Sequence, residues 1–564
     1  MIQLKKILEI DPNDPHNWGP ALDALIHSKY AKPLFLLVVL GVVLLVMEIR
    51  GKPKLKDSAS WAKQEHVRRC RELCLKQNIK GGINTVGLEL AENLPVFDAV
   101  TSLITIGAPK TGKTFGATLA GLYAHLKHKN PAILVDVQYP VQTEQIVCMA
   151  RQLGYEAKKI NIFAPGCDES GTWNICEYAQ GSYAANFSKL LNDNFATTGG
   201  DKGDRFFDPA GEGLISATLQ LARTIPGLDD VVGCQALLGL SEFPKRIRLN
   251  QDKIDPWVYR AFMQLLSTEK SEKTAASIAG IAANLFKRFT EQDIAPALVG
   301  KTSFPLFLDG PELLILGVRS DLREVIMPIQ MALLSLLVDI NSVPGRKTPL
   351  QICFDELAAA TYRSLPSRIN ENRKFGVYFN LAFQNLAQLE EKYGKNLTTS
   401  ILGACGTQIL FNPREQQTAK LISEIVGTEK YREAQRSRSS SSGKISHSTS
   451  LQVKERPLIP AWRVRLMGQG WAIVLNAGYR SKDGAIEYIP YKCKIKVFDE
   501  YKHLTEWSAS QWTHTRKVFI QRSPQRPVDP EYLKAGVKLA EEFLYLPSEE
   551  DIIKQLADQT LAQY

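Results

Sequence analysis

The chain has 564 residues, of which 44% are apolar, and its formal net charge is +10. This length and composition are those of a folded protein with several domains, not of a chain that is disordered throughout. The charge favours anionic partners such as nucleic acid or acidic lipid headgroups, but only mildly. The nine cysteines are scattered and no C-x-x-C pair repeats, which argues against a zinc site or a disulfide framework and suits a reducing cytoplasm.

An apolar segment at residues 33–49 is predicted to be a transmembrane helix. Its first 15 residues carry no polar side chain, and Lys32 and Arg50 flank the segment. Such a helix spans about 26 Å, slightly less than a bilayer core of about 30 Å, and flanking lysines can snorkel to the interface. A buried core helix is the alternative interpretation.

The charges around this segment predict its orientation. Residues 50–64 hold five Lys or Arg residues and residues 18–32 hold two, which places the C-terminal side in the cytoplasm. The expected order at this end is an N-terminal tail at 1–32, the membrane helix, and a basic connector at 50–98 that contains a helix near 61–76 and a hairpin around 81–90.

Residues 107–114 contain the full phosphate-binding loop pattern G-x-x-x-x-G-K-[S/T]. An apolar, β-rich stretch at 100–106 precedes it and a helical stretch at 115–126 follows it, which is the context that the motif requires. Backbone N–H groups at the positive end of that helix are expected to surround phosphate oxygens. The predicted nucleotide-binding residues are Gly107, Ala108, Pro109, Lys110, Thr111, Gly112, Lys113 and Thr114.

Two of these residues have a predicted chemical role. Lys113 is expected to reach the β- and γ-phosphates of ATP, and the Thr114 hydroxyl is expected to ligate Mg²⁺. The alternative interpretation is a glycine turn before an ordinary helix. The sequence therefore predicts that the chain binds a nucleoside triphosphate.

Strands and helices alternate after this loop, which is typical of a parallel sheet covered by helices. Strands are expected at 132–137, 157–163 and 312–317, with helices near 142–153 and 325–340. Residues 231–294 show helical periodicity with almost no strand signal, which predicts an all-alpha insertion. The predicted nucleotide-binding domain therefore comprises residues 99–228 and 300–500, interrupted by an all-alpha domain at 229–299.

The apolar strand at 350–354 ends in Asp355 and Glu356, which is the pattern of a Walker B segment. Asp355 is expected to hold Mg²⁺, while Glu356 is expected to polarise the attacking water. A further strand at 374–384 ends in Gln384, which is placed to sense the γ-phosphate or to position water. From spacing alone, an ordinary surface glutamine is the simpler interpretation of Gln384.

The remaining segments carry less information. Residues 436–450 are basic and serine-rich, which predicts a mobile linker, with contact to an anionic ligand as the alternative. The C-terminal tail at 501–564 contains one clear helical pattern, near 530–543, and no recognisable motif.

Taken together, these motifs resemble the coupling proteins of bacterial type IV secretion, the TraG/TraD-type ATPases, which are related to FtsK-like DNA motors. The resemblance covers roughly residues 50–500. It rests on Lys56–Ala62, on the phosphate loop, on Phe354–Leu357, and on further segments in family order. These further segments are Arg373–Val377, Gln384–Leu389, Tyr393–Gly394, Glu455–Ile459 and Gly468–Val474.

The resemblance implies a RecA-like P-loop α/β domain with an inserted all-alpha domain and an N-terminal transmembrane helix. It gives Gln384 a role beside the nucleotide and makes Arg373 a candidate arginine finger, supplied by a neighbouring subunit. The all-alpha domain is expected to contact DNA and relaxosome partners. Such proteins assemble as homo-hexamers at the bacterial inner membrane, with the ATPase domain in the cytoplasm.

Three departures from the family pattern stand out. The family usually shows Asp-Pro-Lys-Gly after the second strand, where this chain has Asp136-Val-Gln-Tyr-Pro140, and Trp173-Asn-Ile175 stands where Asn-Pro is typical. Family members also commonly have two membrane helices, and one is predicted here.

The leading hypothesis is a membrane-anchored ATPase that couples DNA or nucleoprotein substrates to a secretion channel during conjugation, with largely sequence-independent DNA binding. The alternatives are an FtsK-like DNA pump, or a receptor that recruits protein substrates and has little motor activity.

Overall fold

The computed structural model describes residues 58–195, 209–268, 271–441 and 444–547. The predicted N-terminal tail and the predicted membrane helix at 33–49 lie outside the described residues. The chain forms two compact units, one of them containing residues 428–456 and the other containing residues 60–427 and 457–564. The larger unit holds every predicted nucleotide-site residue.

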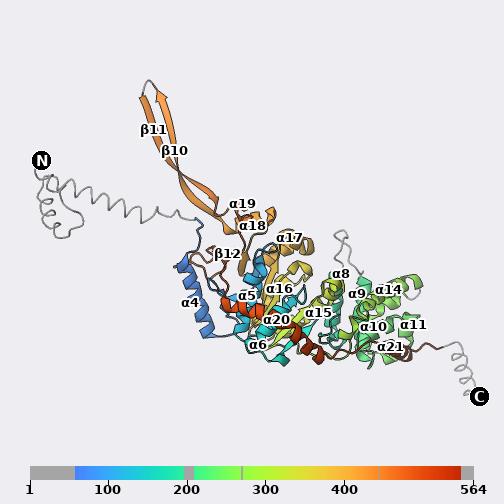
Figure 1. Cartoon of the computed structure of the whole chain (residues 1–564). Coiled ribbons are helices and arrows are strands. Elements are labelled where there is room, and N and C mark those ends of the chain that lie inside the picture. Colours follow the sequence, from blue (N-terminus) through green and yellow to red (C-terminus); the bar gives the residue numbers. More distant parts are fainter. Residues whose placement is uncertain (1–57, 196–208, 269–270, 442–443, 548–564) are drawn as a thin grey trace, which may run out of the picture. The chain divides into compact units, whose positions relative to one another are not determined.

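A nine-stranded sheet organises the larger unit, with strand order β13-β12-β9-β3-β8-β7-β4-β6-β5 (Figure 1). Neighbouring strands from β9 to β5 are parallel, and β12 is antiparallel to both β9 and β13. The bounds are β3 Leu103–Ile106, β4 Ala132–Asp136, β5 Ile160–Phe163, β6 Leu313–Gly317, β7 Leu350–Phe354, β8 Val377–Phe383, β9 Thr407–Leu410, β12 Trp471–Leu475 and β13 Tyr491–Lys494.

Both faces of this sheet are covered, which explains why its parallel strands are apolar almost throughout. Along β4, Ala132 and Leu134 belong to one hydrophobic cluster while Ile133 and Val135 belong to another. The first cluster includes residues of α5 Leu119–Lys127, α6 Thr143–Gln152 and α20 Asp499–Arg522. The second includes residues of α8 Ser182–Phe195, α15 Arg323–Asn341, α16 Leu365–Asn372, α17 Leu386–Ala404 and α18 Gln416–Val426.

One helix in the described part of the chain, Ser320–Asn341, is long and apolar enough to cross a membrane. Because 78% of its apolar window is buried inside the protein, this helix, which contains α15, is a core helix of the sheet domain.

A run of helices without a strand connects β5 to β6 among the described residues. It begins at Ile175, earlier than the expected boundary at residue 229. Its helices are α7 Ile175–Tyr178, α8, α9 Pro209–Thr224, α10 Val231–Leu238, α11 Phe243–Leu249, α12 Pro256–Ala261, α13 Met263–Ser267 and α14 Glu272–Phe289. Asp230 and Asp255 begin α10 and α12, since each carboxylate accepts hydrogen bonds from backbone N–H groups of the first turn.

The connector before β3 contains α4 Gln64–Lys80 and a short antiparallel hairpin of β1 Leu88–Ala91 and β2 Leu94–Val96. The predicted helix near 61–76 is therefore present. The hairpin lies later than the predicted 81–90, because Gly81 ends α4 and the turn falls at Glu92 and Asn93 instead.

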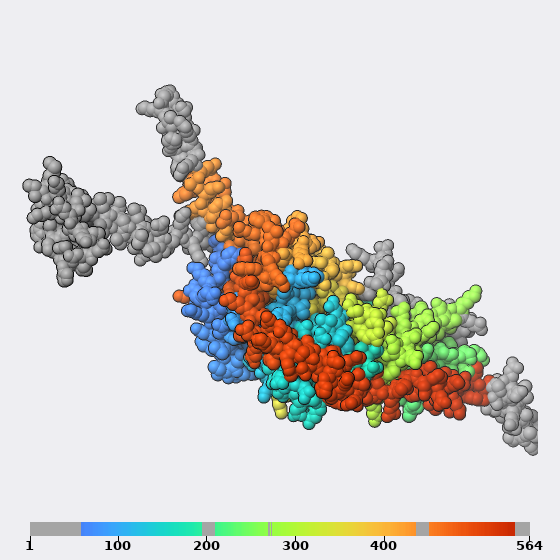
Figure 2. Space-filling model, in the orientation of Figure 1, coloured from blue at the N-terminus to red at the C-terminus, as the bar shows by residue number. Residues whose placement is uncertain are grey.

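Two helices follow the sheet near the C-terminus. The predicted helix is present as α21 Pro530–Phe543, but the 24-residue helix α20 was not predicted. Helix α20 packs against α6 and α21 packs against α10. Figure 2 shows this C-terminal part of the chain, in red, running across one face of the molecule from the sheet domain to the green helices of the inserted region.

The smaller unit contains a two-stranded sheet of β10 Thr428–Ser441 and β11 Lys444–Pro457. The prediction of a linker at 436–450 is therefore wrong for the described residues, which continue both strands. A serine-rich composition indicates the absence of a core, and two extended strands satisfy their backbone hydrogen bonds without one.

Candidate nucleotide-binding site

The phosphate loop lies where the sequence predicts it, between the end of β3 and a helix. The helix begins with a π-helical turn, η3 Thr114–Thr118, and continues as α5. Gly112 has a φ of 101°, a conformation that a side chain disfavours, and Gly470 packs against it. The positive φ and the close packing therefore explain why the motif requires a glycine at position 112.

Three backbone hydrogen bonds hold the loop to neighbouring segments. Gly107 N–H donates to the carbonyl of Phe383 at 3.2 Å, Ala108 N–H donates to that of Asn412 at 3.0 Å, and Gly470 N–H donates to that of Thr111 at 2.9 Å. The Asn412 side chain in turn donates to the carbonyls of residues 465 and 467, which fixes the segment carrying Gly470. Neither Asn412 nor Gly470 was predicted as a site residue, since neither belongs to the phosphate-loop pattern.

The Walker B acids meet the phosphate loop, as the sequence predicts. Thr114 Oγ1 donates to Asp355 Oδ2 at 2.9 Å. Lys113 Nζ lies 3.3 Å from the Asp355 carbonyl and 3.5 Å from Glu356 Oε2. The Lys113 side chain is 8% exposed and that of Glu356 is 19% exposed, so the pair is largely shielded from solvent.

Glu356 is also contacted by the glutamine at the end of β8. Gln384 Nε2 donates to Glu356 Oε2 at 2.8 Å, so this glutamine is part of the site and not an isolated surface residue. Burial raises the pKa of Glu356, while the Lys113 ammonium and the Gln384 hydrogen bond act in the opposite direction. A carboxylate with a raised pKa is a stronger base once ionised, which suits a group that polarises water.

A residue outside the predicted set completes this cluster. Gln142, at the start of α6, donates from Nε2 to Asp355 Oδ2 at 2.9 Å and is buried. A polar residue after a strand was the signal used for Gln384, and Gln142 follows β4 in the same way. Its position six residues after the strand, beyond a turn, hid it from that rule.

The cluster has the oxygen atoms that a Mg²⁺ ion requires. Asp355 Oδ1, Glu356 Oε1 and Gln142 Oε1 are buried and accept no hydrogen bond from the described residues. Buried oxygens without partners are unfavourable unless a ligand or a coordinated water satisfies them, and Mg²⁺ prefers carboxylate and water oxygens. The residues present therefore fit the ion that the phosphate-loop motif implies.

Two other residues of interest lie apart from this cluster. Arg373 precedes β8 whereas Gln384 follows it, so the seven-residue strand separates them by about 20 Å. The Arg373 side chain is 53% exposed and lies 3.4 Å from Asp98. Asp136 is fully buried and accepts hydrogen bonds from Gln138, Gln142 and Thr143, so it holds the turn between β4 and α6.

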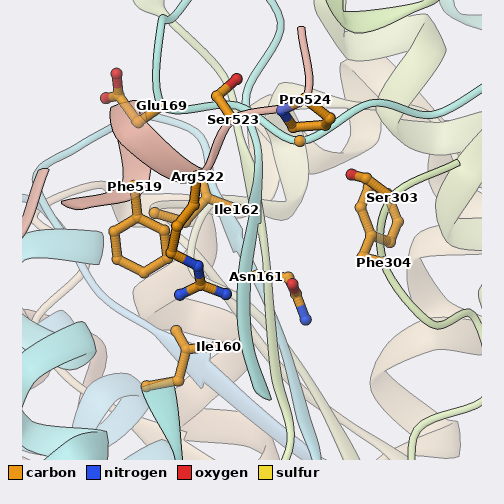
Figure 3. A pocket seen from close by; sticks show the side chains of 11 residues that line it. Ile160, Asn161, Ile162, Glu169, Ser303, Phe304, Phe519, Arg522, Ser523 and Pro524 are labelled. Carbon is orange, nitrogen blue, oxygen red and sulfur yellow. The ribbon is translucent and has the colours of Figure 1, made fainter. Parts of the chain in front are cut away.

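A separate cavity of about 250 Å³ lies beside β5, which is an edge strand of the sheet. Figure 3 shows the ring of Phe519 and the guanidinium of Arg522, both from α20, beside Ile160 and Asn161 of β5. None of the predicted nucleotide-site residues lines it.

Comparisons with known proteins agree with the sequence motifs. Residues 349–469 match the family model described as the TraM recognition site of TraD and TraG. Two curated relatives, the conjugal transfer proteins TraG of Rhizobium radiobacter and of Agrobacterium fabrum, are each 31% identical over 193 residues. These matches cover 34% of this chain and 28% of each relative, so less than a third of the relatives' length is matched.

Solved structures of similar fold include the bacterial conjugative coupling protein TrwB without its first 70 residues, in an unbound form. It has 15% sequence identity and a TM-score of 0.54, and the match covers 79% of this chain and 94% of that one. TrwB in complex with a non-hydrolysable ATP analogue gives 14% identity and a TM-score of 0.54 over 79% of this chain and 95% of that one. At this identity the likeness establishes the RecA-like α/β fold with its helical domain.

The motifs in family order, the match at 349–469 and the conjugal transfer relatives agree with one another: over these segments the chain is similar to the TraG/TraD coupling proteins.

Proposed function

We propose that this protein is a membrane-anchored ATPase that couples DNA or nucleoprotein substrates to a type IV secretion channel in conjugative transfer. The observation that carries the proposal is the joining of Lys113, Thr114, Asp355 and Glu356 in one shielded cluster. A binding module without turnover has no need of the second acid, and Glu356 is held by two polar partners, Lys113 of the phosphate loop and Gln384.

The residues of this cluster divide the chemistry between them. Lys113 neutralises charge on the β- and γ-phosphates, and the Gly107–Thr114 backbone binds phosphate oxygens. Glu356 accepts a proton from the attacking water, and Gln384 keeps the Glu356 carboxylate oriented. Thr114 and Asp355 would hold Mg²⁺, which supplies positive charge to the phosphates when it is bound. TrwB, whose fold is similar, has been solved with ADP and Mg²⁺.

The coupling role is supported by the family. The conjugal transfer relatives and the TraM recognition region of TraD and TraG indicate partners in the relaxosome, and a motor that moves DNA binds it through phosphates with little sequence preference. The predicted helix at 33–49 anchors the protein in the inner membrane as a single-pass protein.

The position of Arg373 supports the assembly of several subunits into a ring. It lies about 20 Å from Gln384 along β8, so it cannot serve the nucleotide of its own chain. An exposed arginine at that end of the sheet is available to a neighbouring subunit, where it would stabilise charge on the γ-phosphate. A homo-hexamer with ATP at the subunit interfaces satisfies this requirement.

The test is ATP hydrolysis by the full-length protein in detergent or nanodiscs, with and without single- and double-stranded DNA, beside the variant Glu356→Gln. Stimulation by DNA that is lost in the variant is the expected result. Turnover that is indifferent to DNA would favour the protein-recruiting receptor, and the absence of Mg²⁺-dependent nucleotide binding would overturn the proposal.

A further inference from the structure

Gln142 contacts the same carboxylate oxygen as Thr114. Both Gln142 Nε2 and Thr114 Oγ1 donate to Asp355 Oδ2, each at 2.9 Å. The Gln142 side chain comes from the start of α6 and crosses from β4 to the end of β7, its neighbour in the sheet. Two donors on one oxygen fix the rotation of the carboxylate about its terminal bond, because turning it would break both hydrogen bonds.

The fold itself does not require this side chain. The start of α6 is held by Asp136, which accepts from the backbone N–H of Gln142 and from both the backbone and the hydroxyl of Thr143. Those contacts involve only the backbone of Gln142 and persist whatever side chain stands there. Gln142 is 4% exposed, and its Oε1 accepts no hydrogen bond from the described residues. Burying an amide with one unused acceptor is unfavourable, so a partner for this acceptor is expected in the loaded site.

We infer that Gln142 is a positioning residue of the divalent-cation site, acting through Asp355. With Oδ2 occupied by Gln142 and Thr114, the other oxygen, Oδ1, is left without a partner and is presented to the cation. Gln142 thereby sets how tightly the nucleotide site takes up Mg²⁺, while leaving the contacts of the protein with phosphate unchanged. The inference rests on the proposed ATPase function and adds to it a residue that lies outside both Walker motifs.

The neighbouring acid of the cluster is contacted by a glutamine in the same way. Gln384 donates to one oxygen of Glu356 as Gln142 donates to one oxygen of Asp355, and in each acid the second oxygen is buried without a partner. Each of the two adjacent acids is thus oriented by a glutamine from a neighbouring strand end. Asp355 is presented to the cation and Glu356 to the attacking water.

The test measures nucleotide affinity and not turnover. The Kd of a fluorescent ADP analogue is determined for the full-length protein in excess Mg²⁺ and in EDTA, and the ratio of the two values gives the gain due to the cation. Gln142→Met keeps the length and volume of the side chain but removes the donor. A hydrogen bond to a charged group corresponds to a factor of about ten or more, so the Mg²⁺-dependent gain is expected to fall about tenfold while the Kd in EDTA is unchanged.

The wild-type protein and two variants serve as controls that separate the possible outcomes. Gln152→Met, an exposed glutamine on the same helix, should keep the full gain, and Asp355→Asn should lose most of it. If the wild-type protein shows no gain from Mg²⁺, the proposed function itself fails. If the wild-type and Gln152→Met proteins show the gain and Gln142→Met shows it undiminished, the inference about Gln142 is overturned.

Two further results also decide the question. A Gln142→Met protein that loses affinity equally in Mg²⁺ and in EDTA would show a general structural role and would contradict the inference. Should Gln142→Met give no cooperative thermal transition, Gln142→Asn replaces it, because its amide is one methylene too short to reach Asp355. The same loss of Mg²⁺-dependent gain is then expected, and an undiminished gain would count against Gln142.

Discussion

The hydroxyl of Thr114 and the carboxylate of Asp355 meet at 2.9 Å although 241 positions separate them in the chain. They follow β3 and β7, which are not neighbours in the sheet, because β8 lies between them. Gln384 directly follows β8, so the residue that lies between the two Walker motifs in space contacts Glu356. The strand order therefore brings all three sequence signals to one edge of the sheet.

Replacement of Lys113 tests the phosphate contact. Lys113→Ala should reduce ATP hydrolysis by at least about 100-fold, because the positive charge that bridges the phosphates is lost from a shielded site. Steady-state phosphate release measures the effect. Lys158→Ala removes an exposed lysine of the same domain and should leave the rate unchanged. Full activity of Lys113→Ala would disprove the assignment of the loop.

Replacement of Glu356 separates binding from hydrolysis. Glu356→Gln should lower the turnover rate by about 10²–10⁴-fold, since the amide no longer accepts the proton of the attacking water. Nucleotide binding should remain, because Lys113 and the loop backbone are intact. Glu391→Gln, an exposed change on α17, serves as the control. Loss of binding in parallel with turnover would assign Glu356 a structural role instead.

The raised pKa of Glu356 predicts the pH dependence of turnover. A general base is active only when ionised, so the rate should fall as the pH falls through the pKa of Glu356, which lies above its ordinary value. Gln384→Leu removes a hydrogen bond that lowers this pKa and should move the acidic limb of the profile to higher pH. The measurement is kcat against pH for both proteins; coincident acidic limbs would exclude this effect of Gln384.

Arg373 is tested by mixing two inactive proteins. Arg373→Ala retains Lys113, and Lys113→Ala retains Arg373, so mixed assemblies contain some interfaces at which both residues are intact. We expect partial recovery of ATPase activity when the two variants are reconstituted together, as a finger supplied by a neighbouring subunit requires. Activity that never exceeds that of either variant alone would argue against a role for Arg373 across the interface.

Buried His125 predicts a pH dependence of stability. Its Nε2 donates to the carbonyl of Pro131 at 2.9 Å, and its Nδ1 accepts from the Tyr378 hydroxyl at 2.8 Å, so the imidazole is neutral in the folded protein. Burial lowers the pKa of His125 to about 3. The unfolded state takes up a proton near pH 6.5, so stability decreases as the pH falls below that value.

Between pH 7.5 and pH 5.5 this histidine alone should reduce the free energy of unfolding by about 1.4 kcal/mol. The measurement is denaturant unfolding of the wild-type protein and of His125→Gln at both pH values. The variant keeps an amide donor for Pro131 and should show a smaller decrease across this interval. An equal decrease in the two proteins would show that His125 does not titrate on unfolding.

The parts of the site that could be predicted are motifs made of residues that are contiguous in the sequence. The phosphate loop and the Asp355–Glu356 pair each follow an apolar strand directly, and both were predicted. Gln142 was not, because five residues separate it from β4 and its contact with Asp355 exists only in three dimensions. Asn412 was not predicted either. It contacts the phosphate loop through its backbone carbonyl, a group that every residue has.

Helix α20 shows why a long element escaped prediction. The residues that it buries include Tyr501, Thr505, Ser508, Trp512 and Thr515, spaced three or four apart as a helix requires. Three of these five are Ser or Thr, so the apolar pattern is interrupted at the helical face itself. The Ser508 hydroxyl donates to the Glu144 carbonyl and accepts from the Cys148 N–H, so hydrogen bonds to α6 replace part of the hydrophobic contact.

The path of the C-terminal segment limits how the inserted helices can move. These helices are joined to the sheet by the chain before α7 and by the chain before β6, two connections that by themselves would allow a hinge. Residues 523–529, between α20 on the sheet and α21 on α10, form a third tether with two prolines. With three connections, rotation of the helical domain is coupled to α20 and hence to α6, the helix that directly follows Gln142.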